Sequence, residues 1–205
     1  MFTGIVSTGH IIETTTKDDC QHFAITPTTP LAHYNIGDSI AINGVCLTIT
    51  HQQENILYVS AVPETLRLTN LSQLKAGSEV NLEAALTPST SMGGHYVQGH
   101  IDVTGRVLEI KQDGASALLV KISLSEPLAK YVVKKGFIAI DGMSITVIDA
   151  EADWFSVTFI PHTIENTLVK HYQVGTLVNL EMDLLAKYVE KLLRNKIEVI
   201  NHAIY

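Results

Sequence analysis

Residues 40–48 read IAINGVCLT, and residues 138–146, 98 positions further along the chain, read IAIDGMSIT. The likeness extends without a gap when residues 31–83 are laid over residues 129–181, and both stretches end in the run VNLE. A repeat of this length indicates a duplication, which must be recognised before any other fold argument. The sequence therefore predicts two domains of the same kind.

The two copies differ chemically just after the shared turn. Cys46 in the first copy is replaced by Ser144 in the second, while the strand and the glycine turn around them are repeated. Two like domains with unlike side chains at the same place suggest unequal roles, such as holding two ligands in different states. We therefore expect the mechanism to depend on this difference.

The bulk composition excludes several classes of protein. The chain has 205 residues, 46% hydrophobic and 17% charged, with a formal net charge of −7 and no cluster of Lys and Arg. A nucleic-acid surface needs a basic footprint, so a small ligand fits better. Two cysteines are too few for a disulfide framework, and the start of the sequence lacks the features of a signal peptide, so we expect a cytoplasmic protein. No apolar run approaches the roughly 20 residues that span a bilayer.

Short β-rich segments alternate with turn signals in both halves. In the first half these segments include residues 1–12, read as a first strand, and residues 38–50, read as a hairpin around Asn43-Gly44. Residues 31–35 are expected to form one helical turn. Six or so short strands in about 90 residues are typical of a small closed barrel. The predicted fold is all-β, with two tandem six-stranded Greek-key β-barrels related by internal duplication.

The domain boundaries are predicted from changes in composition and in the spacing of apolar residues. The predicted barrels cover residues 1–90 and 98–184, and the segment between them is rich in Pro, Ser and Gly. The predicted C-terminal α-helix covers residues 185–205, where apolar residues recur at three- and four-residue spacings. Its apolar side has no partner in a completed barrel, so we expect it to pack on copies of itself in an oligomer.

Several residues could carry chemistry, and each also has a structural interpretation. Cys46 is either a small buried hydrophobe or a nucleophile, and no neighbouring base is visible in the sequence. His95 and His100 lie among glycines, as in a ligand contact, and their spacing does not complete a zinc site. Lys135, Asp141 and Ser144 form either a solvated turn or a polar cluster at the repeated hairpin. The repeated segments that begin at Pro63 and Pro161 are either turn starters or donors and acceptors for a heterocycle.

Six motifs in register resemble the riboflavin synthase family of the duplicated, alpha-chain type. They are MFTGIV at residues 1–6, NGVCLT at 43–48, PETL at 63–66, GGH with GHI at 93–101, KGF at 135–137 and DGMSIT at 141–146. The resemblance covers the whole chain in order, including the closing helix.

This resemblance implies an activity and an assembly. Two molecules of 6,7-dimethyl-8-ribityllumazine would react by transfer of a four-carbon unit, giving riboflavin and 5-amino-6-ribitylamino-pyrimidinedione. It implies no metal and no other cofactor, and a homotrimer held by the C-terminal helices. Each active site would form between the N-terminal barrel of one subunit and the C-terminal barrel of another. Whether the chain also associates with lumazine synthase is left open.

The resemblance also implies site residues, all matched by position. It assigns catalytic or polarising roles to Cys46, His100, Ser144, Asp141, Lys135 and Ser39. It assigns ligand contacts to Gly4, Ile5, Val6, Cys46, Leu47, Thr48, Ser60, Ala61, Val62, Pro63, Glu64, Thr65, Gly99, His100, Ile101, Lys135, Ser144, Ile145, Thr146, Phe159, Ile160, Pro161, His162, Thr163 and Ile164. Which group is the base, and whether Cys46 acts covalently, does not follow from residue type and position.

Two other functions remain open at this point. A non-catalytic lumazine or flavin carrier, like the lumazine proteins of luminous bacteria, would share the duplicated barrel. A generic β-barrel interaction module would bind no small molecule, and it leaves the polar residues at matching turns unexplained.

Overall fold

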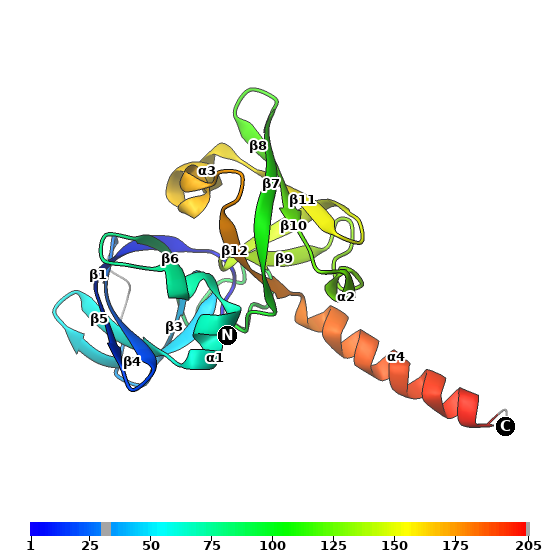
Figure 1. Cartoon of the computed structure of the whole chain (residues 1–205), viewed down its shortest axis with the longest axis horizontal. Helices are drawn as coiled ribbons and strands as arrows, with labels where there is room; N and C mark the ends of the chain where they lie inside the picture. Colours follow the sequence, from blue (N-terminus) through cyan, green and yellow to red (C-terminus); the bar gives the residue numbers. More distant parts are fainter. Residues whose placement is uncertain (30–33, 204–205) are drawn as a thin grey trace.

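The computed structural model describes residues 1–29 and 34–203, with side chains described as far as residue 193. Within this part of the chain, the strands form two closed six-stranded antiparallel barrels, followed by a long C-terminal helix that extends away from both (Figure 1). The predicted all-β fold with tandem barrels is confirmed. Within the same ranges, no helix combines the length and the apolarity needed to span a bilayer.

The first barrel consists of strands β1 to β6 in the cyclic order β1-β2-β5-β4-β3-β6. Its elements are β1 (Ser7–Lys17), β2 (Cys20–Pro27), β3 (Ser39–Ile42), β4 (Val45–Gln53), β5 (Ile56–Ala61), α1 (Pro63–Leu68), the 3-10 helix η1 (Asn70–Gln73) and β6 (Glu79–Ala84). The short helices α1 and η1 connect β5 to β6. This crossing connection, with β3, β4 and β5 as sequential neighbours, is the predicted Greek-key pattern.

The second barrel repeats this order with β7 to β12. Its elements are β7 (Val103–Asp113), β8 (Ala117–Ser123), α2 (Glu126–Ala129), β9 (Phe137–Ile140), β10 (Met143–Ala150), β11 (Trp154–Phe159), α3 (Pro161–Asn166), the 3-10 helix η2 (Leu168–His171) and β12 (Leu177–Met182). Irregularities in pairing also recur, between Ile49 and His51 in β4 and between Val147 and Asp149 in β10. The duplication therefore extends to the strand register.

Each barrel encloses its own apolar core because alternate strand residues point inward. In β3, Ile40 and Ile42 are fully buried, as are the matching Ile138 and Ile140 in β9. The Asn43-Gly44 turn between β3 and β4 has positive φ at both residues, 46° and 77°, which suits a two-residue hairpin. The hairpin predicted from the sequence is confirmed.

The start of the chain differs from the prediction. Residues 1–12 were expected to form one strand, but β1 begins only at Ser7, because Gly4 turns the chain with a φ of 80°. Ahead of β1, Phe2 forms an antiparallel bridge with Val97, just before the second barrel. The helical turn expected at residues 31–35 lies mostly outside the described residues.

The two entry segments, residues 2–6 and 97–101, cross between the barrels. Val6 precedes the first barrel but packs against the core of the second, while Ile101 packs against the core of the first. Phe2 and Val97 are buried between the barrels together with Ala41 and Ala139. Each barrel is therefore completed by the segment that leads into the other.

Helix α4 (Leu184–Ala203) confirms the helix expected at the C-terminus. Its exposed apolar side chains lie at helical spacing: Leu185, Tyr188, Val189, Leu192 and Leu193 are between 54% and 65% exposed. Figure 1 shows the helix projecting from the second barrel.

Candidate functional site

The predicted site residues fall into two sets related by the duplication. Each set combines a strand after a hairpin turn, the end of the next strand with its following helix, and the entry segment of the opposite barrel. We call Cys46, Thr48, residues 60–65 and residues 99–101 the first half-site. We call Ser144, Thr146, residues 159–164 and residues 4–6 the second half-site.

Backbone hydrogen bonds place each entry segment directly against the residue that differs between the copies. The Cys46 N–H donates to the Gly99 carbonyl at 2.9 Å, and the Ser144 N–H donates to the Gly4 carbonyl at 2.9 Å. A Cβ atom on either glycine would lie 2.5 Å from the Cβ of Cys46 or Ser144. Only glycine allows this approach, and both glycines also have a positive φ.

Two buried glutamates hold the entry segments in place. Glu83 accepts hydrogen bonds from the N–H groups of Thr3 and Gly4, at 2.6 and 3.0 Å. Glu181 accepts from the N–H groups of Gln98, Gly99 and His100, at 2.6 to 2.9 Å. Burial raises the pKa of both carboxyls, although these hydrogen bonds act in the opposite direction. The sequence showed the repeated glutamates, but not the segments they hold.

The two half-sites differ in the partner of their central residue. In the second half-site, His95 Nδ1 lies 2.6 Å from Ser144 Oγ. In the first, no histidine nitrogen among the described residues is within hydrogen-bond distance of the Cys46 thiol. His95 was considered from the sequence for acid-base work or ligand contact, but the resemblance gave it no assigned role.

The resemblance assigned a catalytic role to Asp141, but the structure places its side chain away from both half-sites. It is 1% exposed and lies between the two barrels. Its Oδ1 accepts from Asn70 Nδ2 at 2.9 Å and from the Asn179 N–H at 2.8 Å, and its Oδ2 accepts from the Tyr172 hydroxyl at 2.6 Å. Burial raises its pKa to about 6. Its oxygens are committed to protein donors, so its role is to join the barrels.

The matching residue of the first copy, Asn43, belongs to the same inter-barrel network. Asn179 Nδ2 donates to the Asn43 carbonyl at 2.8 Å, and in the matching bond Asn81 Nδ2 donates to the Asp141 carbonyl at 2.9 Å. The network thus repeats across a local twofold relationship. It fixes the orientation of one half-site relative to the other.

Other predicted residues take varied positions. Leu47, Ala61 and Phe159 are buried in the barrel cores, so their side chains support the strands and do not face a ligand. Ser39 lies opposite Thr48 across β3 and β4, which brings it beside the first half-site.

Three more polar residues were assigned to the site by their position in the sequence, and the structure shows their contacts. His100 is exposed, and its backbone N–H is held by Glu181. Ser60 is already engaged, because its hydroxyl lies 2.7 Å from His22 Nδ1. Lys135 is exposed at a turn with a φ of 65°, and its backbone N–H donates to the Val147 carbonyl.

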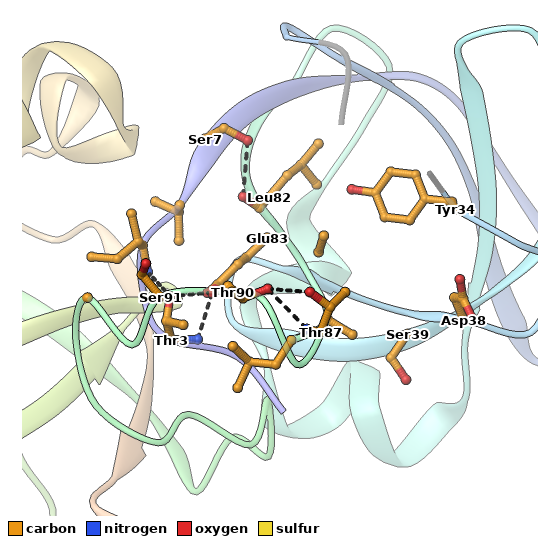
Figure 2. Close-up of a pocket in the computed structure, with 16 residues that line it drawn as sticks. Thr3, Ser7, Tyr34, Asp38, Ser39, Leu82, Glu83, Thr87, Thr90 and Ser91 are labelled. Atoms are coloured by element: carbon orange, nitrogen blue, oxygen red, sulfur yellow. Dashed lines mark hydrogen bonds between the residues drawn. The ribbon is translucent and has the colours of Figure 1, made fainter. Parts of the chain in front are cut away.

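A cavity of about 780 Å³ lies between the N-terminal segment, the first barrel and the inter-barrel linker. Figure 2 shows Tyr34, Asp38 and Ser39 on one side of it and Thr3 and Ser91 on the other. Ile5 and Val6 of the second half-site also line it. Among the described residues, its lining includes the carboxyl groups of Asp38 and Glu83. The described residues also contain no group of His, Cys, Asp and Glu side chains able to hold a metal ion.

Comparison with known proteins gives a family for both halves. The model of the lumazine binding domain matches residues 3–85 and again residues 98–183. These two matches coincide with the two barrels and include residues 3–6 and 98–101 of the entry segments. They also include the glutamates that hold those segments.

Curated relatives match over nearly the whole chain. Riboflavin synthase of Actinobacillus pleuropneumoniae is 41% identical over 197 residues, covering 96% of this chain and 91% of the relative. Riboflavin synthase of Schizosaccharomyces pombe is 42% identical, covering 94% and 93%. That of Bacillus subtilis is 37% identical, covering 94% and 90%.

Solved structures with this fold include a second kind of protein. LumP complexed with riboflavin has a TM-score of 0.81 and 25% identity, covering 89% of this chain and 99% of that one. LumP complexed with 6,7-dimethyl-8-(1'-D-ribityl) lumazine has a TM-score of 0.78 at the same identity and coverage. The relatives at about 40% identity are the stronger match. With two lumazine-binding domains and full-length relatives of one kind, this chain belongs to the riboflavin synthase family.

Proposed function

We propose that this protein converts two molecules of 6,7-dimethyl-8-ribityllumazine into riboflavin and 5-amino-6-ribitylamino-pyrimidinedione. The two products together contain the same atoms as the two substrates. The reaction therefore needs no oxidant, reductant or further substrate. Membership of the riboflavin synthase family supports this activity.

The duplicated half-site is the observation that carries the proposal. Cys46 and Ser144 occupy the same place in two copies of one scaffold, each against the entry glycine of the other barrel. Two identical substrates that play unequal parts call for two similar sites with unlike groups. An enzyme that acts on a single substrate molecule has no need of that arrangement.

The chemistry depends on positioning and on proton transfer. The C7 methyl group of the lumazine is acidic because its carbanion delocalises into the ring, so a modest base can generate the carbon nucleophile. Holding the two ligands in contact lowers the activation free energy by up to roughly 7 to 11 kcal/mol. The reason is that their translational and rotational entropy is lost on binding and not in the reaction step. Serine, threonine and backbone groups of the half-sites can hold the polar edges of the two rings.

We propose further that each active site combines the first half-site of one subunit with the second half-site of another, in a homotrimer. Within one chain, both half-sites leave apolar side chains open: Ile5, Val62 and Ile160 are 51% to 59% exposed. An aromatic ligand on such a surface binds more tightly when a second surface covers its other face, because more of its apolar area is then buried. The exposed apolar stripe of α4 supplies a second contact surface between copies.

Incubation of the purified chain with 6,7-dimethyl-8-ribityllumazine tests the activity. Repeated turnover that yields one riboflavin for every two lumazines consumed is the expected result. A stable fluorescent complex without product would contradict the proposal and favour a carrier that binds the lumazine without converting it. The assay mixture contains no added metal and no redox cofactor, so it also tests whether the reaction proceeds from the two lumazines alone.

Light scattering in solution tests the assembly. The full chain is expected to have the mass of three copies, and Leu185→Glu combined with Leu192→Glu is expected to reduce it. As a matched control, Lys191→Glu changes a charged, exposed residue of the same helix and should leave the mass unchanged. A helix-face variant that stays trimeric would contradict the role of α4.

A further inference from the structure

An ion pair links helix α4 to the segment that enters the first half-site. Lys187 Nζ lies 2.7 Å from Asp102 Oδ2, and the two side chains are only 25% and 22% exposed. Asp102 directly follows residues 99–101, which belong to the first half-site. The helix that carries the exposed apolar stripe therefore also contacts the edge of a half-site in its own chain.

Lys187 occupies a position in α4 that the helix itself disfavours. The helix begins at Leu184, so Lys187 lies in its first turn, and that turn contains no acidic residue. The N-terminal end of a helix carries a partial positive charge, which destabilises a cation placed there. The ammonium group is stabilised by a carboxylate outside the helix. Its position therefore serves a contact with the barrel and not the stability of α4.

Strand β12 binds the entry segment on both sides of Glu181. The Leu180 carbonyl accepts from the Asp102 N–H at 3.0 Å, and Asp102 Oδ2 accepts from the Met182 N–H at 2.8 Å. Between these two bonds, the Glu181 carboxylate accepts from the backbone N–H groups of residues 98–100. The aspartate oxygen that contacts the ammonium group therefore also fixes the end of the entry segment.

The charge of Lys187 also acts on Glu181. Burial raises the pKa of Glu181, while the hydrogen bonds from residues 98–100 and the positive charge of Lys187 act in the opposite direction. The ammonium group thus favours the charged carboxylate, and a charged acceptor forms stronger hydrogen bonds than a neutral one. Lys187 therefore stabilises the entry segment through two carboxylates.

The matching place in the first copy cannot form an ion pair, because Ser7 occupies it. Ser7 and Asp102 each lie three residues after an entry glycine, Gly4 or Gly99. The Ser7 hydroxyl donates to the Leu82 carbonyl, and the chain after β6 continues as the linker between the barrels. The second copy therefore carries charged groups beyond those that the shared scaffold requires.

We propose that Lys187 is a positioning residue for the first half-site, through which α4 holds the entry segment against Cys46. The Cys46 N–H donates to the Gly99 carbonyl, so a shift of the segment changes the contact with the strand that carries the thiol. A displacement of about 1 Å can cost on the order of 100-fold in rate. The inference rests on the proposed function for its substrate, but the contact itself lies within one chain.

Helix α4 binds its own barrel at a second point, which provides a matched control. Glu190 contacts Lys130 Nζ at 2.7 Å and the Tyr131 hydroxyl at 3.3 Å. Lys130 and Tyr131 do not belong to the entry segment. Removing the charge of Lys130 therefore weakens the docking of α4 without changing the carboxylates that hold the segment.

Amide hydrogen exchange of the protein without ligand, followed by NMR, measures the stability of each entry segment separately. In Lys187→Gln, exchange of the Gly99 and Cys46 amides is expected to accelerate by about tenfold, because a charged hydrogen-bond partner is lost. Exchange of the Gly4 and Ser144 amides in the other half-site should stay within about twofold of wild type. The duplication supplies this internal control, since general destabilisation would accelerate both sets.

Three further variants identify the group responsible. Lys187→Arg keeps the charge and should restore wild-type exchange, and Lys130→Gln should leave both entry segments unchanged. Asp102→Asn removes the negative charge but can still accept from the Met182 N–H, and it should reproduce the pattern of Lys187→Gln. This variant leaves α4 unaltered, so it decides the question even where Lys187→Gln fails to fold. Equal acceleration in Lys130→Gln would overturn the specific role of Lys187.

Turnover of 6,7-dimethyl-8-ribityllumazine shows whether this positioning matters for the reaction. Riboflavin formation is expected to fall by about tenfold in Lys187→Gln and in Asp102→Asn. Lys187→Arg, and Lys191→Gln at an exposed lysine of the same helix, should keep wild-type turnover. Light scattering checks that each variant has the mass of the wild type, so that a lower turnover does not come from dissociation.

The double variant tests whether Lys187 acts through Asp102. Adding Asp102→Asn to Lys187→Gln should cost no more than about a further twofold in turnover, because the shared contact is already lost. Fully additive losses would overturn the proposal. Accelerated exchange in Lys187→Gln with wild-type turnover would also overturn it, because the hold on the segment would then not serve the site.

The two measurements separate this inference from the proposed function. If exchange of the Gly99 and Cys46 amides depends on Lys187 but the wild type forms no riboflavin, the proposed function fails and the positioning role stands. If the wild type forms riboflavin while Lys187→Gln changes neither exchange nor turnover, the inference alone fails.

Discussion

Gly44 and Gly142 meet backbone to backbone between the barrels: a Cβ on Gly44 would lie 2.6 Å from the Gly142 nitrogen. Both are the second residue of the repeated hairpin turn, with φ values of 77° and 83°. The duplicated turns therefore serve twice, first as hairpins within each barrel and then as the point where the barrels touch. The residues that differ, Cys46 and Ser144, follow two positions later.

Gly44→Ala should be more destabilising than an alanine at a comparable turn. A positive φ costs an alanine about 1 kcal/mol, and the clash with Gly142 should add roughly 1 to 3 kcal/mol. Gly77→Ala is the control, because Gly77 has a φ of 88° with nothing within 4 Å of an added Cβ. Denaturant unfolding of both variants measures the difference, and equal losses would contradict a contact between the turns.

Asp141→Asn should remove a pH dependence of stability without breaking the inter-barrel network. The amide oxygen can still accept from Asn70 and Asn179, and its NH₂ group can donate to the Tyr172 hydroxyl. The folded-state pKa of about 6 lies above the ordinary 3.8. Folding therefore favours the protonated form, and the stabilising effect of that proton is lost as the pH rises from about 4 to 6.

Unfolding free energies of wild type and Asp141→Asn across that range provide the measurement. The wild type is expected to lose about 3 kcal/mol relative to the variant between pH 4 and pH 6, with no further change above. Asp141→Ala, which leaves three buried donors unpaired, should be destabilising by several kcal/mol at every pH, on the order of 1 to 3 for each donor. Parallel curves for wild type and Asp141→Asn would show that Asp141 does not titrate as described.

Glu181→Gln should disturb the first half-site specifically. Its carboxylate receives the backbone N–H groups of Gln98, Gly99 and His100, and hydrogen bonds to charged groups contribute about 1.5 to 3 kcal/mol. These bonds hold the segment against Cys46. We expect turnover to fall by about tenfold for each 1.4 kcal/mol of this stabilisation that is lost. Glu109→Gln, at an exposed ion pair with Lys111, is the control. Wild-type turnover in Glu181→Gln would show that the segment is held by other contacts.

Cys46→Ser should keep folding and ligand binding while slowing turnover. The substitution makes the first half-site resemble the second, where Ser144 occupies the same place, and so removes the difference between the copies. Lumazine titration and riboflavin formation measured on the same sample separate the two effects. Full activity in this variant would remove Cys46 from the mechanism.

The sequence was sufficient to predict the features that depend on local patterns or on the internal repeat. The hairpin at Asn43-Gly44 was visible from turn chemistry, and the two barrels followed from the repeat. The exchange of Cys46 for Ser144 could be located because the two copies align around it without a gap. The strand-forming residues at the start of the chain were misleading. Phe2 forms an isolated bridge with Val97, far along the sequence, and β1 begins only at Ser7.

What the sequence could not reveal depends on contacts between distant segments. Glu83 and Glu181 stood in the repeated VNLE run, but nothing local indicates that they bind the entry segments. Asp141 was assigned to the site by resemblance, and the sequence does not show that the turn carries its side chain to the interface between the barrels. The His95 partner of Ser144 comes from the linker, which has no equivalent in the repeat alignment.

The pairing of unlike half-sites from different subunits is the central claim, and subunit complementation tests it most directly. One inactive variant carries Cys46→Ala with Thr48→Ala, and the other carries Ser144→Ala. After the two are dissociated, mixed in equal amounts and reassembled, sites that combine two chains should recover activity to about a quarter of wild type, as random assortment in a closed ring requires. If the mixture stays as inactive as either variant alone although mixed oligomers have formed, each site lies within one chain and the account is wrong.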